Sequence, residues 1–138
     1  VMAIGGVTII NDAYNANPDS VVSALETLSA MTCSGKKIVV LGDMLELGES
    51  SIDEHRNLGD KVNRFGFDWL FTFGQRAAEI NRTADLKHSV HFDNKLKLAE
   101  HLLRQIVPGD IVLFKGSRGM KMEEIISFVK ERLTTAAA

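Results

Sequence analysis

This sequence of 138 residues lacks several features that would assign it to other classes of protein. It has no apolar run near the roughly 18 residues that a membrane-spanning helix needs, and no charged-then-apolar leader segment at its start. Its one cysteine, Cys33, cannot form an internal disulfide, which is typical of a reducing compartment. We therefore expect a cytoplasmic protein without a membrane span.

Charge of one sign is not in excess. The chain has 16 Lys and Arg against 18 Asp and Glu, a formal net charge of -2, and the basic residues are scattered along it. A protein that binds nucleic acid usually presents a basic patch or stripe. We therefore expect no nucleic-acid partner.

Several motifs of phosphate and metal chemistry are missing as well. There is no Gly-x-x-x-x-Gly-Lys-Ser/Thr to hold a triphosphate, and no Gly-x-Gly-x-x-Gly to hold a dinucleotide. No histidine or cysteine cluster has metal-ligand spacing, and no Gly-x-Ser-x-Gly marks a nucleophile. By itself the chain therefore lacks a phosphoryl-transfer apparatus, and we expect neither a metal site nor a catalytic residue within it.

Apolar runs alternate with amphipathic segments along the chain. Two short runs around Gly5-Gly6 have the form of a hairpin, and the later runs are separated by segments with helical periodicity. Such alternation predicts right-handed βαβ units. We therefore predict an α/β, Rossmann-like fold: about five parallel strands, one antiparallel edge strand at the N-terminus, and helices on both faces. The expected domain is residues 1–133, with an unstructured tail at 134–138.

The segment from Asn11 to Ser20 connects a buried run to a helix. Asn17 is a good N-cap and Pro18 suits the first helical position, so the helix should begin there. Capping does not account for Asp12, Tyr14 and Asn15. Loops at the carboxyl ends of parallel strands border ligand crevices, so binding by these three residues and simple turn formation are both open.

Two further strand ends carry polar, glycine-containing loops, at residues 42–48 and 115–119. The second of these loops contains two cations, one hydroxyl and two glycines: Lys115, Arg118, Ser117, Gly116 and Gly119. Glycines let backbone amides approach an anion closely at the start of a helix. This loop therefore predicts a site for a carboxylate or phosphate, and the alternative is a solvated basic turn.

Two histidines need separate interpretation. The capping-box pattern of Ser51 and Glu54 predicts the start of a helix in which His55 points toward the sheet. Without a second histidine or a carboxylate at helical reach, His55 is more typical of a satisfied core residue than of a catalyst. His101 lies off the expected apolar face of a later helix, and we expect it to be solvated.

Three segments, taken in order, resemble the C-terminal domain of the Mur ligases: residues 12–20 (DAYNANPDS), 42–48 (GDMLELG) and 115–123 (KGSRGMKME). The resemblance extends from about Gly6 to Leu133. It is strongest to the member of that family that joins D-alanyl-D-alanine to UDP-N-acetylmuramoyl-tripeptide in peptidoglycan synthesis. The alternative is another Mur-type or a folylpolyglutamate-type amide ligase.

The resemblance implies one domain of a longer ligase. In such a ligase ATP phosphorylates the tripeptide carboxylate, and the amine of D-alanyl-D-alanine attacks the acyl phosphate. An N-terminal domain would hold the UDP-sugar, and a central domain would supply the P-loop and most contacts to ATP and Mg²⁺. The C-terminal domain would close over the ATP and exclude water from the acyl phosphate.

The resemblance also implies roles for single residues. Asp12, Tyr14 and Asn15 would contact the nucleotide, with the Asp12 carboxylate accepting hydrogen bonds from the ribose. Lys115, Ser117 and Arg118 would face the dipeptide carboxylate or the charge that develops near it. Four more residues are expected to line the site without an assigned role: Asn17, Asp43, Glu46 and His55.

Two other classes of protein are weaker alternatives. A receiver-like phosphoacceptor module also has an acid after its first strand and a lysine after its fifth, as Asp12 and Lys115 could be. It needs a second acid beside the first, where this chain has Asn11, and an aspartate after the third strand, where it has Phe73-Gly74. A stand-alone interaction module would leave the three polar loops as a coincidence.

Overall fold

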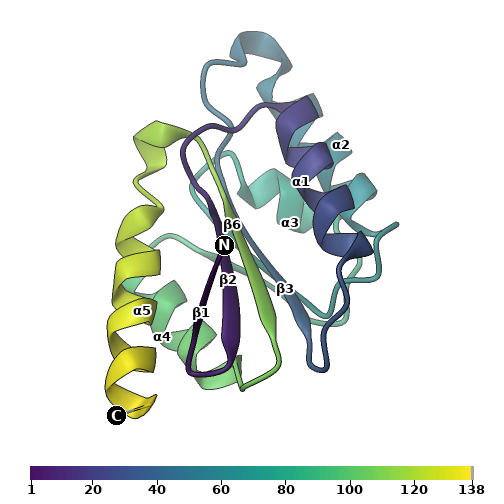
Figure 1. The fold of residues 1–138 in the computed structure, drawn as a ribbon. Helices are drawn as coiled ribbons and strands as arrows, with labels where there is room; N and C mark the ends of the chain where they lie inside the picture. The colour runs from purple at the N-terminus through teal and green to yellow at the C-terminus, as the bar shows by residue number, and fades with distance from the viewer. Residues whose placement is uncertain (138) are drawn as a thin grey trace.

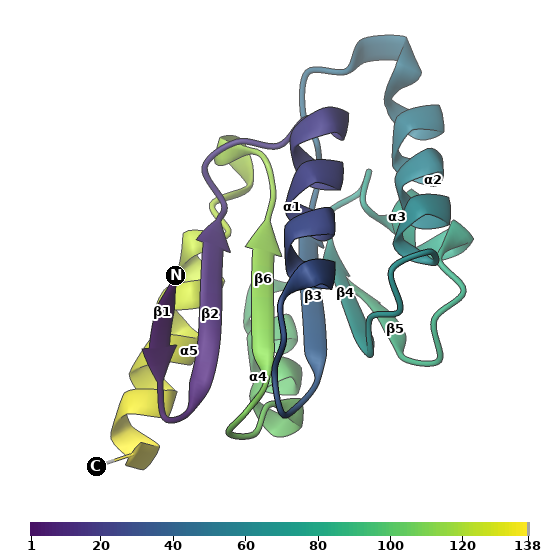
Figure 2. The ribbon, with the colours of Figure 1, turned by 45° about the vertical axis from the view of Figure 1, so that its right-hand side comes forward.

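The computed structural model describes residues 1–137 and contains one sheet with helices on both faces (Figures 1 and 2). The strands are β1 (Met2–Ile4), β2 (Val7–Asp12), β3 (Lys37–Gly42), β4 (Trp69–Phe73), β5 (Ser89–Phe92) and β6 (Ile111–Lys115). The helices are α1 (Pro18–Ala30), α2 (Ser51–Val62), α3 (Ala78–Thr83), α4 (Lys95–Gln105) and α5 (Glu123–Ala137), with the short 3₁₀ helices η1 (Gly48–Ser50) and η2 (Arg118–Met120).

The six strands lie in the order β1-β2-β6-β3-β4-β5. β1 is antiparallel to β2, and every other neighbouring pair is parallel, so the predicted fold class is confirmed. Among the parallel strands the order is first-fifth-second-third-fourth. A receiver module of the doubly wound type has the order 2-1-3-4-5. The receiver alternative is therefore wrong for this chain.

Side-chain alternation along the central strands explains the two helical layers. Val39 and Leu41 pack in the cluster with α1, α2 and α3, whereas Ile38 and Val40 pack in the cluster with α4 and α5. Successive strand residues point to opposite faces, so a run without polar residues indicates a strand covered on both sides. All five residues of β6 are buried, in agreement with its central place in the sheet.

The ends of two helices differ from the sequence prediction. α5 continues through residues 134–137, which were expected to be an unstructured tail. Thr135 Oγ1 donates a hydrogen bond to the Glu131 carbonyl at 2.9 Å, and alanine has the highest helix propensity of all residues. Residue 138 lies outside the described residues. The capping box at Ser51 is absent, because η1 leads directly into α2 and makes Ser51 its first helical residue.

The prediction for His101 is wrong. Its ring packs edge-on against Trp69, Phe71 and Phe92, with centroids 5.4–5.8 Å apart. Helical periodicity placed it beside the apolar face, and the aromatic side chains of β4 and β5 extend that face to include it. Burial, with a smaller repulsion from Arg104, lowers the pKa of His101 below its usual 6.5.

No helix within residues 1–137 combines the length and the hydropathy that crossing a lipid bilayer requires.

Candidate functional site

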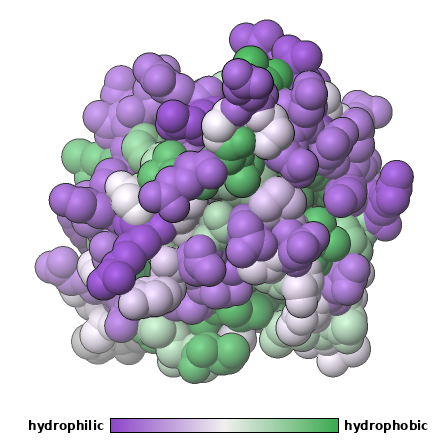
Figure 3. Space-filling view, turned by 90° about the horizontal axis from the view of Figure 1, so that it is seen from above, coloured by the Kyte–Doolittle hydropathy of each residue, from purple (hydrophilic) through white to green (hydrophobic). Residues whose placement is uncertain are grey.

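The three polar loops meet at one edge of the sheet. β6 lies between β2 and β3, so the loops that follow these three parallel strands are adjacent at the upper edge in Figure 1. Figure 3 looks onto this edge and shows a mostly hydrophilic face with apolar groups among the charged and polar ones. The strand order thus brings together all three segments that carried the sequence prediction.

Ser117 joins the three loops. Its hydroxyl accepts a hydrogen bond from the Leu45 amide at 2.7 Å and donates one to the Ala16 carbonyl at 3.3 Å. Its own amide donates to the Asp43 carbonyl at 3.0 Å. Ser117 is buried, and its hydroxyl is hydrogen-bonded to two backbone groups. A direct contact between Ser117 and a substrate stays a prediction, whereas its role in holding the loops together is visible.

Lys115 is paired with Asp12. The Lys115 Nζ lies 3.0 Å from Asp12 Oδ2, and the lysine side chain is 3% exposed against 45% for the aspartate. Both line a groove of about 450 Å³ between β2, β6 and α1, which Asn15 also borders. The structure therefore places Lys115 with two of the residues predicted to contact the nucleotide, in a groove that Ser117 and Arg118 do not line.

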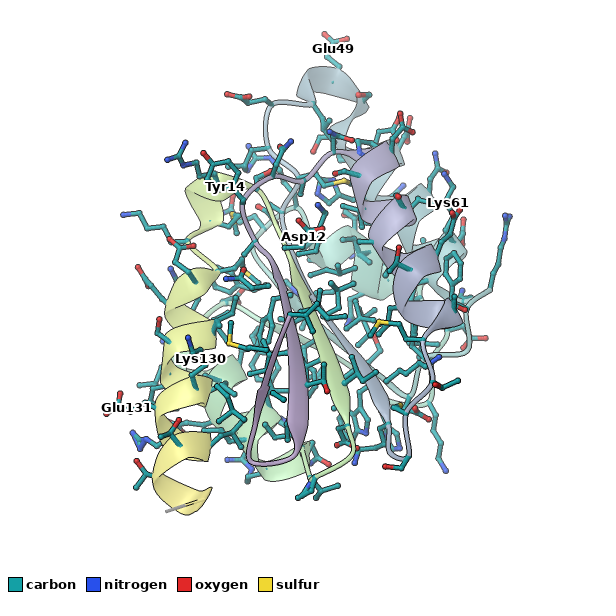
Figure 4. All side chains as sticks on the ribbon, viewed as in Figure 1. Asp12, Tyr14, Glu49, Lys61, Lys130 and Glu131 are labelled. Atoms are coloured by element: carbon teal, nitrogen blue, oxygen red, sulfur yellow. The ribbon has the colours of Figure 1, made fainter. Side chains whose placement is uncertain are left out.

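Tyr14 and Arg118 form a second pair on the other side of the loop after β2. The Arg118 guanidinium lies over the Tyr14 ring, 4.7 Å from its centroid, which is a cation–π geometry. Figure 4 shows Tyr14 above η2 and Asp12 on the side of α1. A pocket of about 340 Å³ lies beside this pair, lined by Asn11, Ala13, Tyr14, Arg118 and Glu123.

A third hollow, of about 570 Å³, lies over the ends of β3 and β6. Asn15, Asn17, Glu46 and Arg118 contribute polar atoms to its lining. The Asn17 side chain is already used as the predicted N-cap, since its Oδ1 accepts from the Ser20 amide at 2.9 Å. Asn15 borders this hollow and the Asp12 groove, so it is the residue that connects them.

Asp43 and Glu46, in the loop after β3, have different surroundings. The buried Asp43 carboxylate accepts from the Ala77 amide at 2.7 Å and lies 3.5 Å from Arg76 Nη1, so it fixes the loop before α3. Glu46 is exposed in the third hollow, with a positive φ of 64°. Of the two acids, Glu46 is therefore the one placed to meet a ligand.

His55 is a satisfied buried residue, as predicted. Its Nε2 accepts from the Met44 amide at 3.0 Å, and its Nδ1 lies 2.6 Å from the Ser51 carbonyl, to which it can only donate. These two contacts together require the neutral tautomer with its proton on Nδ1. The imidazole therefore holds the loop after β3 in place and has no nitrogen free for a ligand.

Glu123 is the site residue to which the sequence prediction gave no role. Glu123 is the last residue of the third segment that resembles the Mur ligases, and this membership could have identified it. It received no role because its negative charge does not fit a loop that was predicted to bind an anion. Within residues 1–137, no group of three or more His, Cys, Asp or Glu side chains is placed to hold a metal ion.

Comparison with known proteins gives consistent matches to one family. The family described as Mur ligase, glutamate ligase domain, matches residues 1–118. The UDP-N-acetylmuramoyl-tripeptide–D-alanyl-D-alanine ligase of Bacillus subtilis (strain 168) is 41% identical over 126 residues, which cover 88% of this chain and 27% of that protein. The ligase of the same name from Escherichia coli (strain K12) is 31% identical over 128 residues, covering 91% and 27%.

A solved structure gives the same result. The crystal structure of a MurF ligase from Thermotoga maritima in complex with ADP superposes with a TM-score of 0.86 at 32% identity, covering 99% of this chain and 31% of that one. The chain thus spans about 27% of the length of the curated relatives above.

Proposed function

This chain belongs to the Mur ligases, and from that membership we propose that it is the C-terminal domain of a ligase that joins D-alanyl-D-alanine to UDP-N-acetylmuramoyl-tripeptide with consumption of ATP. In this proposal the rest of the ligase supplies the P-loop, the Mg²⁺ and the UDP-sugar site. The domain works in the cytoplasm and contributes contacts to the nucleotide and to the dipeptide. It has no activity by itself.

The observation that carries the proposal is the joining of the three loops by Ser117. All three segments that resemble the Mur ligases meet at one edge of the sheet, and hydrogen bonds of 2.7–3.3 Å hold them in register. An interaction module without a ligand at this edge would not need to bury a serine hydroxyl to fix three polar loops. The arrangement therefore supports a site for small molecules.

The Asp12 groove suits a nucleoside. Its mouth has a half-exposed carboxylate that can accept hydrogen bonds from two ribose hydroxyls, and Lys115 has donors left after pairing with Asp12. Ile10 and Leu113 give the groove an apolar floor, and Asn15 has an amide that can pair with a base edge. The relative from Thermotoga maritima was solved with ADP, which supports a nucleotide rather than another hydroxyl-bearing ligand.

The other side of the loop suits the dipeptide. Arg118 is exposed at two hollows, and a guanidinium forms strong, paired hydrogen bonds with a carboxylate. Its place beside Tyr14 puts the proposed dipeptide site next to the proposed nucleotide site. Such proximity is required if an activated carboxyl and an attacking amine are to meet.

The test is an amide-shift NMR titration of this chain, first with a magnesium-bound, non-hydrolysable ATP analogue and then with D-alanyl-D-alanine, both at millimolar concentration. We expect the nucleotide to shift the amides of Asp12, Asn15 and Lys115, and the dipeptide to shift those of residues 117–119. Shifts spread evenly over the sheet, or confined to the opposite edge, would contradict the proposal. If both loops remain silent, the same titration of the full-length ligase decides, and silence there would also contradict it.

A further inference from the structure

The pocket beside Tyr14 contains two opposite charges that do not pair with each other. Arg118 and Glu123 both line it and both are exposed. Among residues 1–137, neither side chain has an oppositely charged group within 4.0 Å. A guanidinium and a carboxylate that face one pocket without closing on each other leave room for a ligand that carries both charges.

Tyr14 restricts where the guanidinium of Arg118 can go. The ring covers one face of the guanidinium at 4.7 Å, so the N–H groups at its edge remain the part available for hydrogen bonds. Tyr14 itself is 69% exposed, so the stacked pair lies at the surface of the domain. The pair therefore presents a positioned cation at one end of the pocket.

The position of Glu123 at the start of α5 does not by itself explain why it lines the pocket. Glu123 and Glu124 both lie in the first turn, where an acid interacts favourably with the helix dipole. Glu124 has a second partner, because its carboxylate lies 2.8 Å from Lys95 Nζ and its pKa is lowered by that contact. Glu123 has no such partner among the described residues and lines the pocket instead.

We propose that Glu123 binds the ammonium end of D-alanyl-D-alanine while Arg118, held by Tyr14, binds its carboxylate. This inference rests on the function proposed above and adds a residue to it. Consecutive Cα atoms are about 3.8 Å apart, so the two charged ends of a dipeptide are separated by roughly 5 Å or more. That separation fits two charges more than 4.0 Å apart in one pocket of about 340 Å³.

In this arrangement Glu123 is a binding and positioning residue. It selects the ligand with a free amino terminus and orients that end relative to the proposed nucleotide groove on the other side of the loop. The specificity of the pocket is therefore for a zwitterion with its charges one peptide unit apart.

The test uses steady-state kinetics of the full-length ligase that carries this domain. Glu123→Gln keeps the shape of the side chain and removes its charge, so we expect the KM for D-alanyl-D-alanine to rise about tenfold, the lower worth of a charged hydrogen bond, with the KM for ATP unchanged. Glu124→Gln is the matched control, one residue along the same helix turn. It should leave both KM values unchanged.

The same contact can be removed from the ligand. Propanoyl-D-alanine lacks the ammonium group. As a competitive inhibitor of the unmodified ligase, it should therefore bind about tenfold more weakly than D-alanyl-D-alanine. In the Glu123→Gln variant this discrimination should disappear, an outcome that a structural role for Glu123 would not produce. Circular dichroism of both variants checks that the fold is retained.

The outcomes separate the two proposals. If Glu123→Gln leaves the dipeptide KM and the discrimination unchanged while Arg118→Ala raises the dipeptide KM, the role of Glu123 is wrong and the proposed function stands. If neither variant affects the dipeptide, or both affect only ATP, the proposed dipeptide site is wrong as a whole.

Discussion

Lys115 lies directly opposite Asp12 in the ladder between β2 and β6, so strand register rather than loop conformation sets the ion pair between them. The lysine is buried on the floor of the groove, and the aspartate reaches its mouth. A buried cation needs its counter-ion more than a half-exposed anion does, because only the cation has lost most of its hydration. The two residues are therefore not equivalent in their effect on stability.

This asymmetry gives the first prediction. Asp12→Ala should lower the free energy of unfolding by about 1–2 kcal/mol, less than for a fully buried pair, because it leaves the Lys115 ammonium without its partner. Lys115→Met keeps most of the volume and removes the charge, so it should cost under about 1 kcal/mol. Urea unfolding of this chain and both variants measures the difference. A larger loss for Lys115→Met than for Asp12→Ala would contradict it.

Asp12 also gives a kinetic prediction. In the full-length ligase, Asp12→Ala should raise the KM for ATP about tenfold, since a lost ribose hydrogen bond to a charged group is worth roughly 1.5–3 kcal/mol. The KM for the dipeptide should not change. Asp19→Ala, which removes an exposed acid from the first turn of α1, is the control. Unchanged ATP kinetics in the Asp12 variant would remove this residue from the site.

Arg118 should act on the other substrate. Arg118→Ala should raise the KM for D-alanyl-D-alanine about tenfold or more with little effect on ATP, because a charge-assisted pair of hydrogen bonds to the carboxylate is lost. Arg118→Lys should recover only part of this, since an ammonium has no planar fork and stacks less well on Tyr14. Arg132→Ala, which removes an exposed arginine stacked on Phe128, is the control. If Arg118→Ala changed only the KM for ATP, the proposed position of the dipeptide at Arg118 would be wrong.

The pH dependence of stability should depend on His101. Burial holds its pKa below 6.5 in the folded chain, so between these two values the unfolded state binds more protons. Stability should therefore fall as the pH drops from above 6.5 through the lowered pKa. His101→Phe keeps the contacts with the aromatic cluster and removes the titrating group. Between about pH 7.5 and about pH 5.5, roughly one unit either side of the unfolded pKa, the unfolding free energy of this variant should fall less than that of the unmodified chain. Equal losses in both proteins would contradict this.

The sequence was sufficient for the layers of the fold. Runs such as Ile38–Leu41 have no polar residue on either face, which is typical of a strand covered by helices on both sides. Asn17 and Pro18 fixed the start of α1, and the structure shows the expected side-chain cap. The predicted capping box at the start of α2 was wrong, because a Ser and a Glu three residues apart also occur inside the first turn of a helix. Here η1 leads directly into α2, so Ser51 is already helical and does not cap the helix.

The site could be predicted only as a set of loops. Which side chains meet depends on the strand order, and the periodicity of apolar residues does not contain that order. For this reason Lys115 was grouped with Arg118, its neighbour in the chain, although it pairs with Asp12 across the ladder. The bonds of Ser117 to residues 16 and 45 were unpredictable for the same reason.

The place of β6 in the sheet has a consequence for how the site is acquired. The strand that comes last in the chain fills the gap between β2 and β3, so contacts with Ser117 span up to 101 residues of sequence. Chains dominated by such long-range pairings fold slowly, because the entropy of closing the loops is lost before the contacts are gained. During synthesis, β2 and β3 must each wait with an unpaired edge until β6 has left the ribosome, and unpaired edges are prone to aggregation. We therefore expect the ligand site to form in the last step of folding, together with the closure of the sheet.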